Sequence, residues 1–275
     1  MTRSESDISR TLYIDLLKRA LTNWIHGHEE FVPVQTTPIG RLLGPMMYPR
    51  GAELVRIQRF DEQKRQVGQE WPAPLFAHTM IGIKRLDNLQ MCVEKVISDQ
   101  IAGDLVETGV WKGGATIFMR GVLKAYGENQ RRVWVADSFQ GLPPPNPNEY
   151  PEDKGDIHFM IDSLGVSIDR VKENFAAYGL LDDRVVFLKG WFSDTLPTAP
   201  IDRLSILRLD GDMYQSTMVA LKSLYDKLSV GGYVIVDDYC IASCRTAITD
   251  FRDEMRIKDE IIDIDGTGIF WRRSA

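Results

Sequence analysis

The chain has 275 residues, of which 44% are apolar and 26% charged, and its 33 Lys and Arg against 39 Asp and Glu give a formal charge of −6. This composition predicts a globular protein with a sizeable core, built as one large domain or as one domain with an appendage. A pI near 5.3 without a basic stripe argues against nucleic acid as a partner. No apolar run reaches the ~20 residues that cross a bilayer. Because Met1–Arg10 also lacks the apolar stretch of a secretory signal, we expect a cytoplasmic protein.

The first third of the chain, residues 1–98, is expected to form an N-terminal helical and lid region. Apolar residues recur at helical spacing in Tyr13–Trp24 and in Asn88–Ile97, which predicts two amphipathic helices. Phe31–Gly51 contains four prolines and predicts a long loop that acts as a lid. The charged segment Glu53–Glu70 predicts a solvated helix or a pair of turns.

From residue 104 onward, short apolar runs alternate with amphipathic segments. Strands are expected at Leu105–Glu107, Arg132–Ala136, Arg184–Lys189, Leu204–Leu209 and Tyr233–Val236, the last after a turn at Gly231–Gly232. Helices are expected at Thr116–Tyr126, Ser167–Tyr178, Ser216–Lys227 and Arg245–Met255, and a final hairpin joins Glu260–Ile264 to Ile269–Trp271. The alternation predicts an α/β fold with a mostly parallel sheet, covered on both faces and closed by an antiparallel strand. Ligands bind such sheets beyond the carboxyl ends of the strands, so the residues after each strand are the candidate site.

The first three strands are followed by residues suited to an adenosyl ligand. Glu107, beside the flexible Gly109, can accept hydrogen bonds from a ligand ammonium and would repel a pyrophosphate, which disfavours a dinucleotide. Asp137 can bind the ribose hydroxyls of NAD or of an adenosyl group, or it can cap a helix. Trp191 and Phe192 can stack on an adenine or belong to the core.

Carboxylates are concentrated after the fourth and fifth strands, at Asp210, Asp212, Asp237 and Asp238. Such a concentration of negative charge is destabilising unless a positive group lies within it. Oxygen ligands without His or Cys suit a hard divalent ion such as Mg²⁺, Mn²⁺ or Ca²⁺. The sequence therefore predicts a metal site here, and the alternative is two unrelated pairs of capping residues.

The histidines give weaker indications. His26 and His28 have no third ligand nearby and are expected to be solvated. His78 is expected either to form a pocket wall or to pack in the interior. His158 follows the acidic segment Pro143–Asp156 and either approaches a substrate or lies at the surface.

Four motifs that fall in the same order along the chain resemble those of the macrocin O-methyltransferases of the TylF/MycF type. They are Glu107-Thr-Gly-Val-Trp-Lys-Gly-Gly, Ala136-Asp-Ser-Phe-Gln-Gly-Leu-Pro143, Leu209-Asp-Gly-Asp-Met-Tyr214 and Val236-Asp-Asp-Tyr-Cys240. The resemblance covers residues 11–275. It implies a class I S-adenosylmethionine (SAM) methyltransferase fold, Rossmann-like and seven-stranded, in residues 99–275. It also implies metal-dependent methylation of a sugar hydroxyl on an antibiotic, and a homodimer.

The resemblance also implies roles for individual residues. Those expected to surround SAM are Glu107 and Gly109 at the methionine end, Asp137 at the ribose, Ser138, Trp191, Phe192 and Asp210 along the cofactor, and Thr79, Met80 and Ile81 from the front segment. Those expected to bind Mg²⁺ are Asp210, Asp237 and Asp238, with Asp210 also as general base and Asp212 nearby without contacting the ion.

Three functions other than sugar methylation would also account for parts of the sequence. The same machinery could methylate a catechol, whose two adjacent oxygens chelate an ion. An NAD-dependent oxidoreductase would explain Asp137 but would leave the aspartate cluster without a role. A non-catalytic binding protein would explain the fold alone.

Overall fold

The computed structural model describes residues 5–26, 29–33, 55–59, 61–68 and 76–275, and its centre is a seven-stranded sheet of order β5-β4-β3-β6-β7-β9-β8. The parallel strands are β3 (Asp104–Thr108), β4 (Val133–Asp137), β5 (Val185–Lys189), β6 (Leu204–Leu209) and β7 (Leu228–Val236). The antiparallel strand β9 (Ile269–Arg272) pairs with β7 and with β8 (Ile262–Asp263). The prediction of a mostly parallel sheet ending in an antiparallel hairpin is confirmed.

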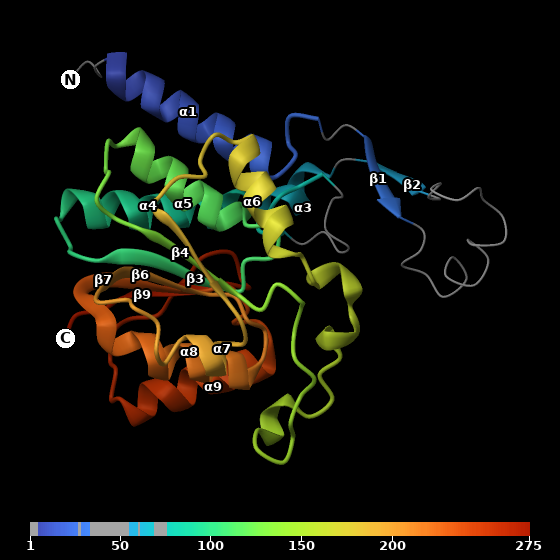
Figure 1. Ribbon diagram of the computed structural model, residues 1–275, viewed down its shortest axis with the longest axis vertical. Helices are drawn as coiled ribbons and strands as arrows, with labels where there is room; N and C mark the ends of the chain where they lie inside the picture. Colours follow the sequence, from blue (N-terminus) through green and yellow to red (C-terminus); the bar gives the residue numbers. More distant parts are fainter. Residues whose placement is uncertain (1–4, 27–28, 34–54, 60, 69–75) are drawn as a thin grey trace.

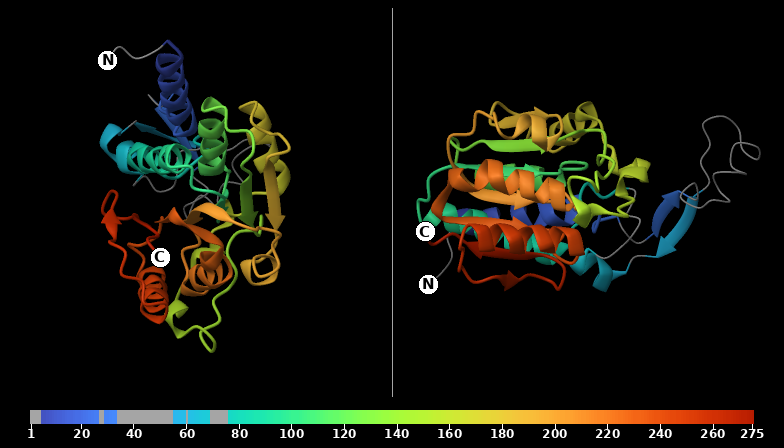
Figure 2. Two further views of the ribbon diagram at one scale, coloured as in Figure 1. Left: turned by 90° about the vertical axis from the view of Figure 1, so that its left-hand side faces the viewer. Right: turned by 90° about the horizontal axis from the view of Figure 1, so that it is seen from below.

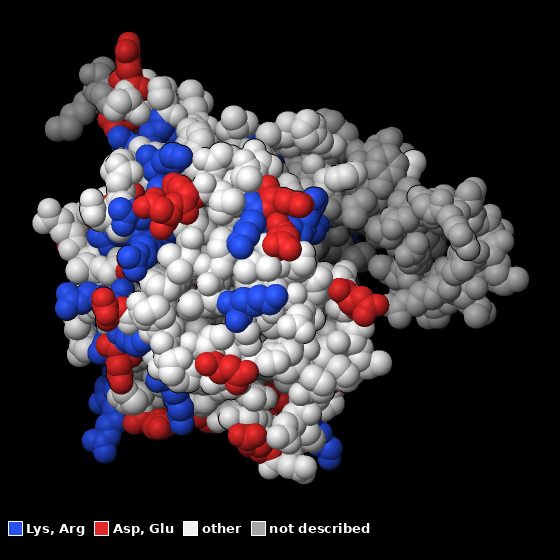
Figure 3. Space-filling model, viewed as in Figure 1, with Lys and Arg blue, Asp and Glu red and all other residues white. Residues whose placement is uncertain are grey.

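Helices cover both faces of the sheet, as predicted (Figures 1 and 2). On one face lie α1 (Glu5–Leu21), α4 (Ile83–Ser98), α5 (Gly114–Ala125) and α6 (Ile168–Ala177), and on the other lie α7 (Phe192–Thr195), α8 (Tyr214–Leu224) and α9 (Ala242–Glu254). Each side has its own buried apolar cluster, since the central strands are apolar on both faces. Among the described residues no helix is long and apolar enough to cross a membrane. Acidic and basic side chains are interspersed over the face shown in Figure 3.

The two helices predicted near the N-terminus are present with different bounds. α1 begins eight residues before the predicted Tyr13 and ends at Leu21, after which Asn23 adopts a left-handed backbone conformation (φ 55°). Glu5 and Asp7 in its first turn favour this earlier start, because negative charge stabilises a helix N-terminus. Ile14, Leu17 and Leu21 share one core with α5.

Two predictions for the front segment were partly wrong. Phe31–Pro33 was predicted as loop but belongs to β1 (Glu29–Pro33), which pairs antiparallel with β2 (Val55–Arg59). The beginning of Glu53–Glu70 was predicted as helix or turn and forms β2, while α3 (Glu62–Val67) follows. Alternation in Val-Arg-Ile-Gln-Arg has the period of a strand, and this outweighed its charge. The rest of the predicted lid, 34–51, lies outside the described residues.

The predicted turn at Gly231–Gly232 was also wrong, because both glycines lie within β7. Gly231 has φ +86°, a conformation that favours glycine. A Cβ on Gly232 would lie 2.7 Å from the Ser205 carbonyl oxygen. The pairing of β6 with β7 shifts register between Leu204 and Ile206. The glycines therefore accommodate an irregularity in the ladder and do not end the strand.

The segment between β4 and α6 contains three short 3-10 helices, η2 (Pro151–Asp153), η3 (His158–Met160) and η4 (Asp162–Leu164). The carboxylate of Asp153 connects this segment to α8. Asp153 is 1% exposed and accepts hydrogen bonds from the backbone amides of Tyr214 (2.7 Å) and Gln215 (3.0 Å). These are the first residues of α8, so Asp153 caps that helix from a distant part of the chain.

Replacing Asp153 with Ala should lower the free energy of unfolding by about 1–2 kcal/mol, because two helix N-terminal amides lose their acceptor. Urea denaturation followed by circular dichroism measures the change. Asp162→Ala, an exposed position on the same segment, is the control and should change stability by less than ~0.5 kcal/mol. Equal effects of the two substitutions would contradict the capping role.

Candidate active site

Two adjoining cavities lie at the carboxyl ends of the parallel strands, and together they include all the site residues predicted from the sequence. The first, of about 300 Å³, is lined by Gly109, Asp137, Ser138, Trp191 and Phe192. The second, of about 530 Å³, is lined by Thr79, Ile81, Glu107, Asp237 and Asp238. Met80, Asp210 and Asp212 line both cavities. We call the first the donor cavity and the second the acceptor cavity.

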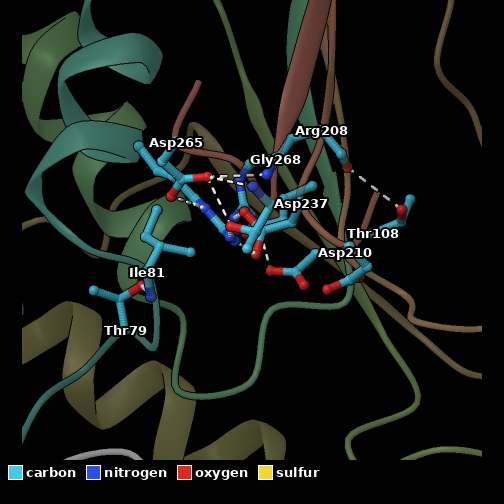
Figure 4. Close-up of polar contacts among 12 residues, drawn as sticks. Thr79, Ile81, Thr108, Arg208, Asp210, Asp237, Asp265 and Gly268 are labelled. Carbon is cyan, nitrogen blue, oxygen red and sulfur yellow. Dashed lines mark hydrogen bonds and ion pairs between the residues drawn. The ribbon is translucent and has the colours of Figure 1, made fainter. Parts of the chain in front are cut away.

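The buried guanidinium of Arg208 joins the carboxylates of three strand ends. Arg208 is paired in register with Glu107 on the neighbouring strand, so the two side chains point to the same face of the sheet. Its Nη1 donates to Glu107 and, at 2.7 Å, to Asp210 Oδ2, and its Nη2 donates to Asp237 Oδ1 at 2.5 Å (Figure 4). Sequence analysis missed Arg208. A lone charged residue in the fully buried strand Leu-Ser-Ile-Leu-Arg-Leu was the feature that could have revealed it.

A second arginine binds the other carboxylate oxygen of Asp237. Arg85, near the start of α4, binds Asp237 Oδ2 through Nη1. It also binds Asp265 at 2.8 Å and Thr267, both on the turn between β8 and β9. The C-terminal hairpin is therefore connected through Arg85 to the end of β7. Sequence analysis missed this role as well.

Negative charge still exceeds positive charge around these two arginines. The five carboxylates that line the cavities are Glu107, Asp210, Asp212, Asp237 and Asp238, against the guanidinium groups of Arg85 and Arg208. Burial, then repulsion by Asp237, raises the pKa of Asp210 to about 7. Burial is also the main cause that raises the pKa of Asp212 to about 6 and that of Glu107 to about 8, and it raises the pKa of Asp238 strongly. An added cation would relieve this repulsion.

Three of the carboxylates are arranged as a divalent ion would require. One oxygen each from Asp210, Asp237 and Asp238 lie within 4.8 Å of one another. Arg208 binds Oδ2 of Asp210, and the amide of Asp212 donates to Oδ2 of Asp238 at 3.0 Å, which leaves Oδ1 of these two residues for an ion. Both oxygens of Asp237 accept from arginines, and each keeps a further lone pair. The donors are all oxygen, as Mg²⁺ prefers. These residues fit a hard divalent ion.

Asp137 in the donor cavity and Glu107 at the end of β3 offer hydrogen-bond acceptors to a ligand that carries hydroxyl and ammonium groups. Asp137 accepts a hydrogen bond from the amide of Val110 at Oδ2 (2.7 Å), and from the amide of Phe139 (2.6 Å) and the hydroxyl of Ser138 (3.5 Å) at Oδ1. Oδ2 keeps a lone pair for a ligand hydroxyl. Oε2 of Glu107 is buried and has no hydrogen-bond partner among the described residues. An unpartnered buried carboxylate oxygen is costly, and a ligand ammonium would satisfy it.

The turns that bring these side chains together have unusual backbone conformations. A Cβ on Gly109 would lie 1.7 Å from the carbonyl oxygen of Asp210, so only glycine allows the ends of β3 and β6 to approach this closely. Trp111, Phe139 and Asp212 have φ of 49°, 58° and 60° just after three parallel strands. Left-handed conformations in residues other than glycine are strained and concentrate at functional sites.

The histidines separate into different surroundings. His158 lines the acceptor cavity together with Asp212 and Asp238. His78 instead packs against Tyr178, with Nδ1 2.7 Å from the phenol oxygen, and burial lowers its pKa to about 4. His26 is exposed, as predicted, and His28 lies outside the described residues.

The doubly covered sheet, its antiparallel hairpin and the acidic strand ends define a methyltransferase of the α/β class. The family model of macrocin-O-methyltransferase (TylF) matches residues 10–273. The chain therefore belongs to this family, as the sequence motifs predicted, and it is a SAM-dependent O-methyltransferase. The alternatives of an NAD-dependent oxidoreductase and of a non-catalytic protein are set aside.

Individual relatives are similar over nearly their whole length. The chain is 53% identical to demethyldecarbamoylnovobiocin O-methyltransferase of Streptomyces niveus, over 99% of this chain and 97% of the relative. It is 49% identical to 8-demethyl-8-(2,3-dimethoxy-alpha-L-rhamnosyl)-tetracenomycin-C 4'-O-methyltransferase of Streptomyces olivaceus, over 97% and 94% of the two chains. The structure of the O-methyltransferase NovP superimposes with a TM-score of 0.84 at 45% identity, covering 97% of this chain and 100% of that one.

Replacing Glu107 with Gln should weaken the binding of S-adenosylhomocysteine by about 10- to 100-fold. The substitution keeps the shape of the side chain but removes the charged acceptor that an ammonium would use, and hydrogen bonds to charged groups contribute about 1.5–3 kcal/mol. Isothermal titration calorimetry measures the affinity. Glu94→Gln on α4, where Glu94 contacts Gln90 and Tyr126 away from both cavities, is the control. Unchanged affinity in Glu107→Gln would show that this oxygen does not contact the ligand.

Proposed function

We propose that this chain transfers the methyl group of SAM to a sugar hydroxyl of a glycosylated natural product, with the help of Mg²⁺. The observation that carries this proposal is the cluster of Asp210, Asp237 and Asp238 between a cavity suited to the cofactor and a second cavity of about 530 Å³. The names of the relatives support the substrate class, since one of them acts on a rhamnosylated tetracenomycin. A homodimer, and the division at residue 98, stay predictions.

Residues from the two cavities together would hold the cofactor, since Gly109, Asp137, Ser138, Trp191 and Phe192 line the donor cavity while Glu107, Thr79 and Ile81 line the acceptor cavity. We assign Glu107 and Gly109 to its methionine end, Asp137 to its ribose, and Ser138, Trp191 and Phe192 to its adenosine, with Thr79, Met80 and Ile81 closing the pocket. Met80 lines both cavities, so the reacting methyl group would lie where they meet. Such positioning of donor and acceptor supplies much of the reduction in the barrier.

The three aspartates would bind the ion and receive the proton. A bound divalent ion would polarise the acceptor hydroxyl and lower its pKa. Asp210 is the residue we assign as proton acceptor, because it lines both cavities and belongs to the cluster that would hold the ion. Arg208 and Arg85 keep Asp237 fixed between them, so that its carboxylate stays in place before any ion binds.

Replacing Asp238 with Asn should weaken Mg²⁺ binding and lower kcat by at least ~10-fold, because the ion loses a charged ligand. The affinity for S-adenosylhomocysteine should stay nearly unchanged. Metal titration calorimetry and turnover assays measure the two effects, with Asp253→Asn at an exposed position of α9 as control. Wild-type turnover of Asp238→Asn in the presence of a chelator would rule out the metal site.

The substrate class is tested by incubating the purified protein with SAM and a panel of α-L-rhamnosides and other 6-deoxyhexosides, with catechol as the competing acceptor. We expect mass spectrometry to find one added methyl group on a sugar. EDTA should abolish the product and added MgCl₂ should restore it. Methylation of catechol alone would show that the acceptor is phenolic, and activity that survives EDTA would exclude the metal-assisted step.

A further inference from the structure

A histidine with a carboxylate partner lies at the wall of the acceptor cavity, and the proposed mechanism does not use it. Nδ1 of His158 is 2.8 Å from Asp156 Oδ2, and the His158 amide donates to Asp156 Oδ1 at 2.8 Å. The carboxylate therefore fixes the ring through one bond and the backbone through another. The side chain of Asp156 is 8% exposed and that of His158 is 34% exposed. The pair is thus anchored on one side and accessible on the other.

The pair is connected to the end of β6 through the capping residue described above. The amide of Asp156 donates to the carbonyl of Asp153 at 3.1 Å, and the Asp153 carboxylate caps α8. α8 begins two residues after Asp212, which lines both cavities. The segment that carries His158 is therefore fastened to the same strand end that carries the aspartate cluster.

His158 lies in the same cavity as the aspartate cluster and away from Asp137, the residue assigned to the ribose. It lines the acceptor cavity and is absent from the lining of the donor cavity. Asp212 lies close enough for its charge to affect the imidazole. The charged groups that line the same cavity are Arg85, Glu107, Asp210, Asp212, Asp237 and Asp238. Partial burial lowers the pKa of His158, but its hydrogen bond to the Asp156 carboxylate and the charges of Asp212 and Asp156 together raise it more.

The chemistry of the ring identifies what it could hold. Because Nδ1 is committed to Asp156, Nε2 is the nitrogen left for a ligand, and an imidazole nitrogen can donate to or accept from a hydroxyl. Both oxygens of Asp156 already bind His158 itself, so the carboxylate is an orienting group for the ring.

We propose that Asp156 and His158 form a subsite for the acceptor sugar, in which Nε2 of His158 hydrogen-bonds a hydroxyl next to the one that is methylated. His158 is then a binding residue for the acceptor, and Asp156 is a positioning residue that acts through it. The inference rests on the proposed function, because it requires the acceptor to carry neighbouring hydroxyl groups. It adds a means of choosing between sugars, since a buried polar group left without its partner discriminates strongly against a ligand that lacks the hydroxyl.

The experiment compares wild type, His158→Leu and Asp156→Asn with the best glycoside from the panel and with its monodeoxy analogues. In His158→Leu we expect KM for the glycoside to rise about 10- to 100-fold, the effect of losing one hydrogen bond that can be charge-assisted. Affinities for S-adenosylhomocysteine and Mg²⁺ should stay within about twofold, since the side-chain hydrogen bond of His158 is to Asp156, which is assigned to neither ligand. His26→Leu, which removes an exposed histidine that lines neither the donor nor the acceptor cavity, is the matched control and should change nothing.

The monodeoxy analogues separate direct contact from an indirect structural effect. One analogue should lose kcat/KM with wild type but suffer no additional loss with His158→Leu, because the partner of that hydroxyl is already gone. Asp156→Asn should give an intermediate effect and should lower the pKa of His158, measured by NMR titration.

Two outcomes would overturn the inference. If His158→Leu keeps wild-type KM, or if every analogue loses the same factor in both proteins, the subsite is refuted while the proposed function stands. If wild type methylates no glycoside in the panel, the proposed function fails, and the subsite fails with it.

Discussion

The site depends on one buried cation. Arg208 lies in the middle strand of the sheet, and its side chain is 1% exposed while it binds Glu107, Asp210 and Asp237. Removing a charge from water costs several kcal/mol, and only well-placed partners offset that cost. The carboxyl ends of β3, β6 and β7 are therefore held in one arrangement, because moving any of them would leave a buried charge unpaired.

This arrangement explains how several carboxylates can be held close together before a ligand binds. Arg208 and Arg85 compensate part of the charge, while the remaining excess is available for a divalent ion. In the function proposed here the cofactor and the acceptor would meet beside Asp210, because Met80 and Asp210 line both cavities. The strained turns at Gly109 and Asp212 allow the strand ends to approach closely enough for this. Catalysis of this kind depends on groups that are in place before the substrate arrives.

The structure brings together the predicted site residues that follow strands, whereas sequence analysis did not connect Arg85, Arg208 or His158 to them. Asp137, Asp210 and Asp237 stand directly at strand ends, and parallel strands bring their carboxyl ends to one edge, so local sequence was sufficient. Arg85 comes from a helix that precedes the sheet, and His158 from an irregular segment, so no spacing in the chain connects either to the aspartates. The strand at Val55–Arg59 was missed because charge was given more weight than alternation.

The sequence by itself determined the α/β class, the order of the main strands and helices after residue 104, and the family, because hydrophobic periodicity and contiguous motifs are local properties of the chain. Tertiary structure alone decided which strands are neighbours, and hence that Glu107, Arg208 and Asp237, which lie far apart in the chain, form one buried network. It also decided that Asp153 caps a helix more than sixty residues away. Such contacts depend on strand order and register, which are set by the packing of the whole sheet and not by any one segment.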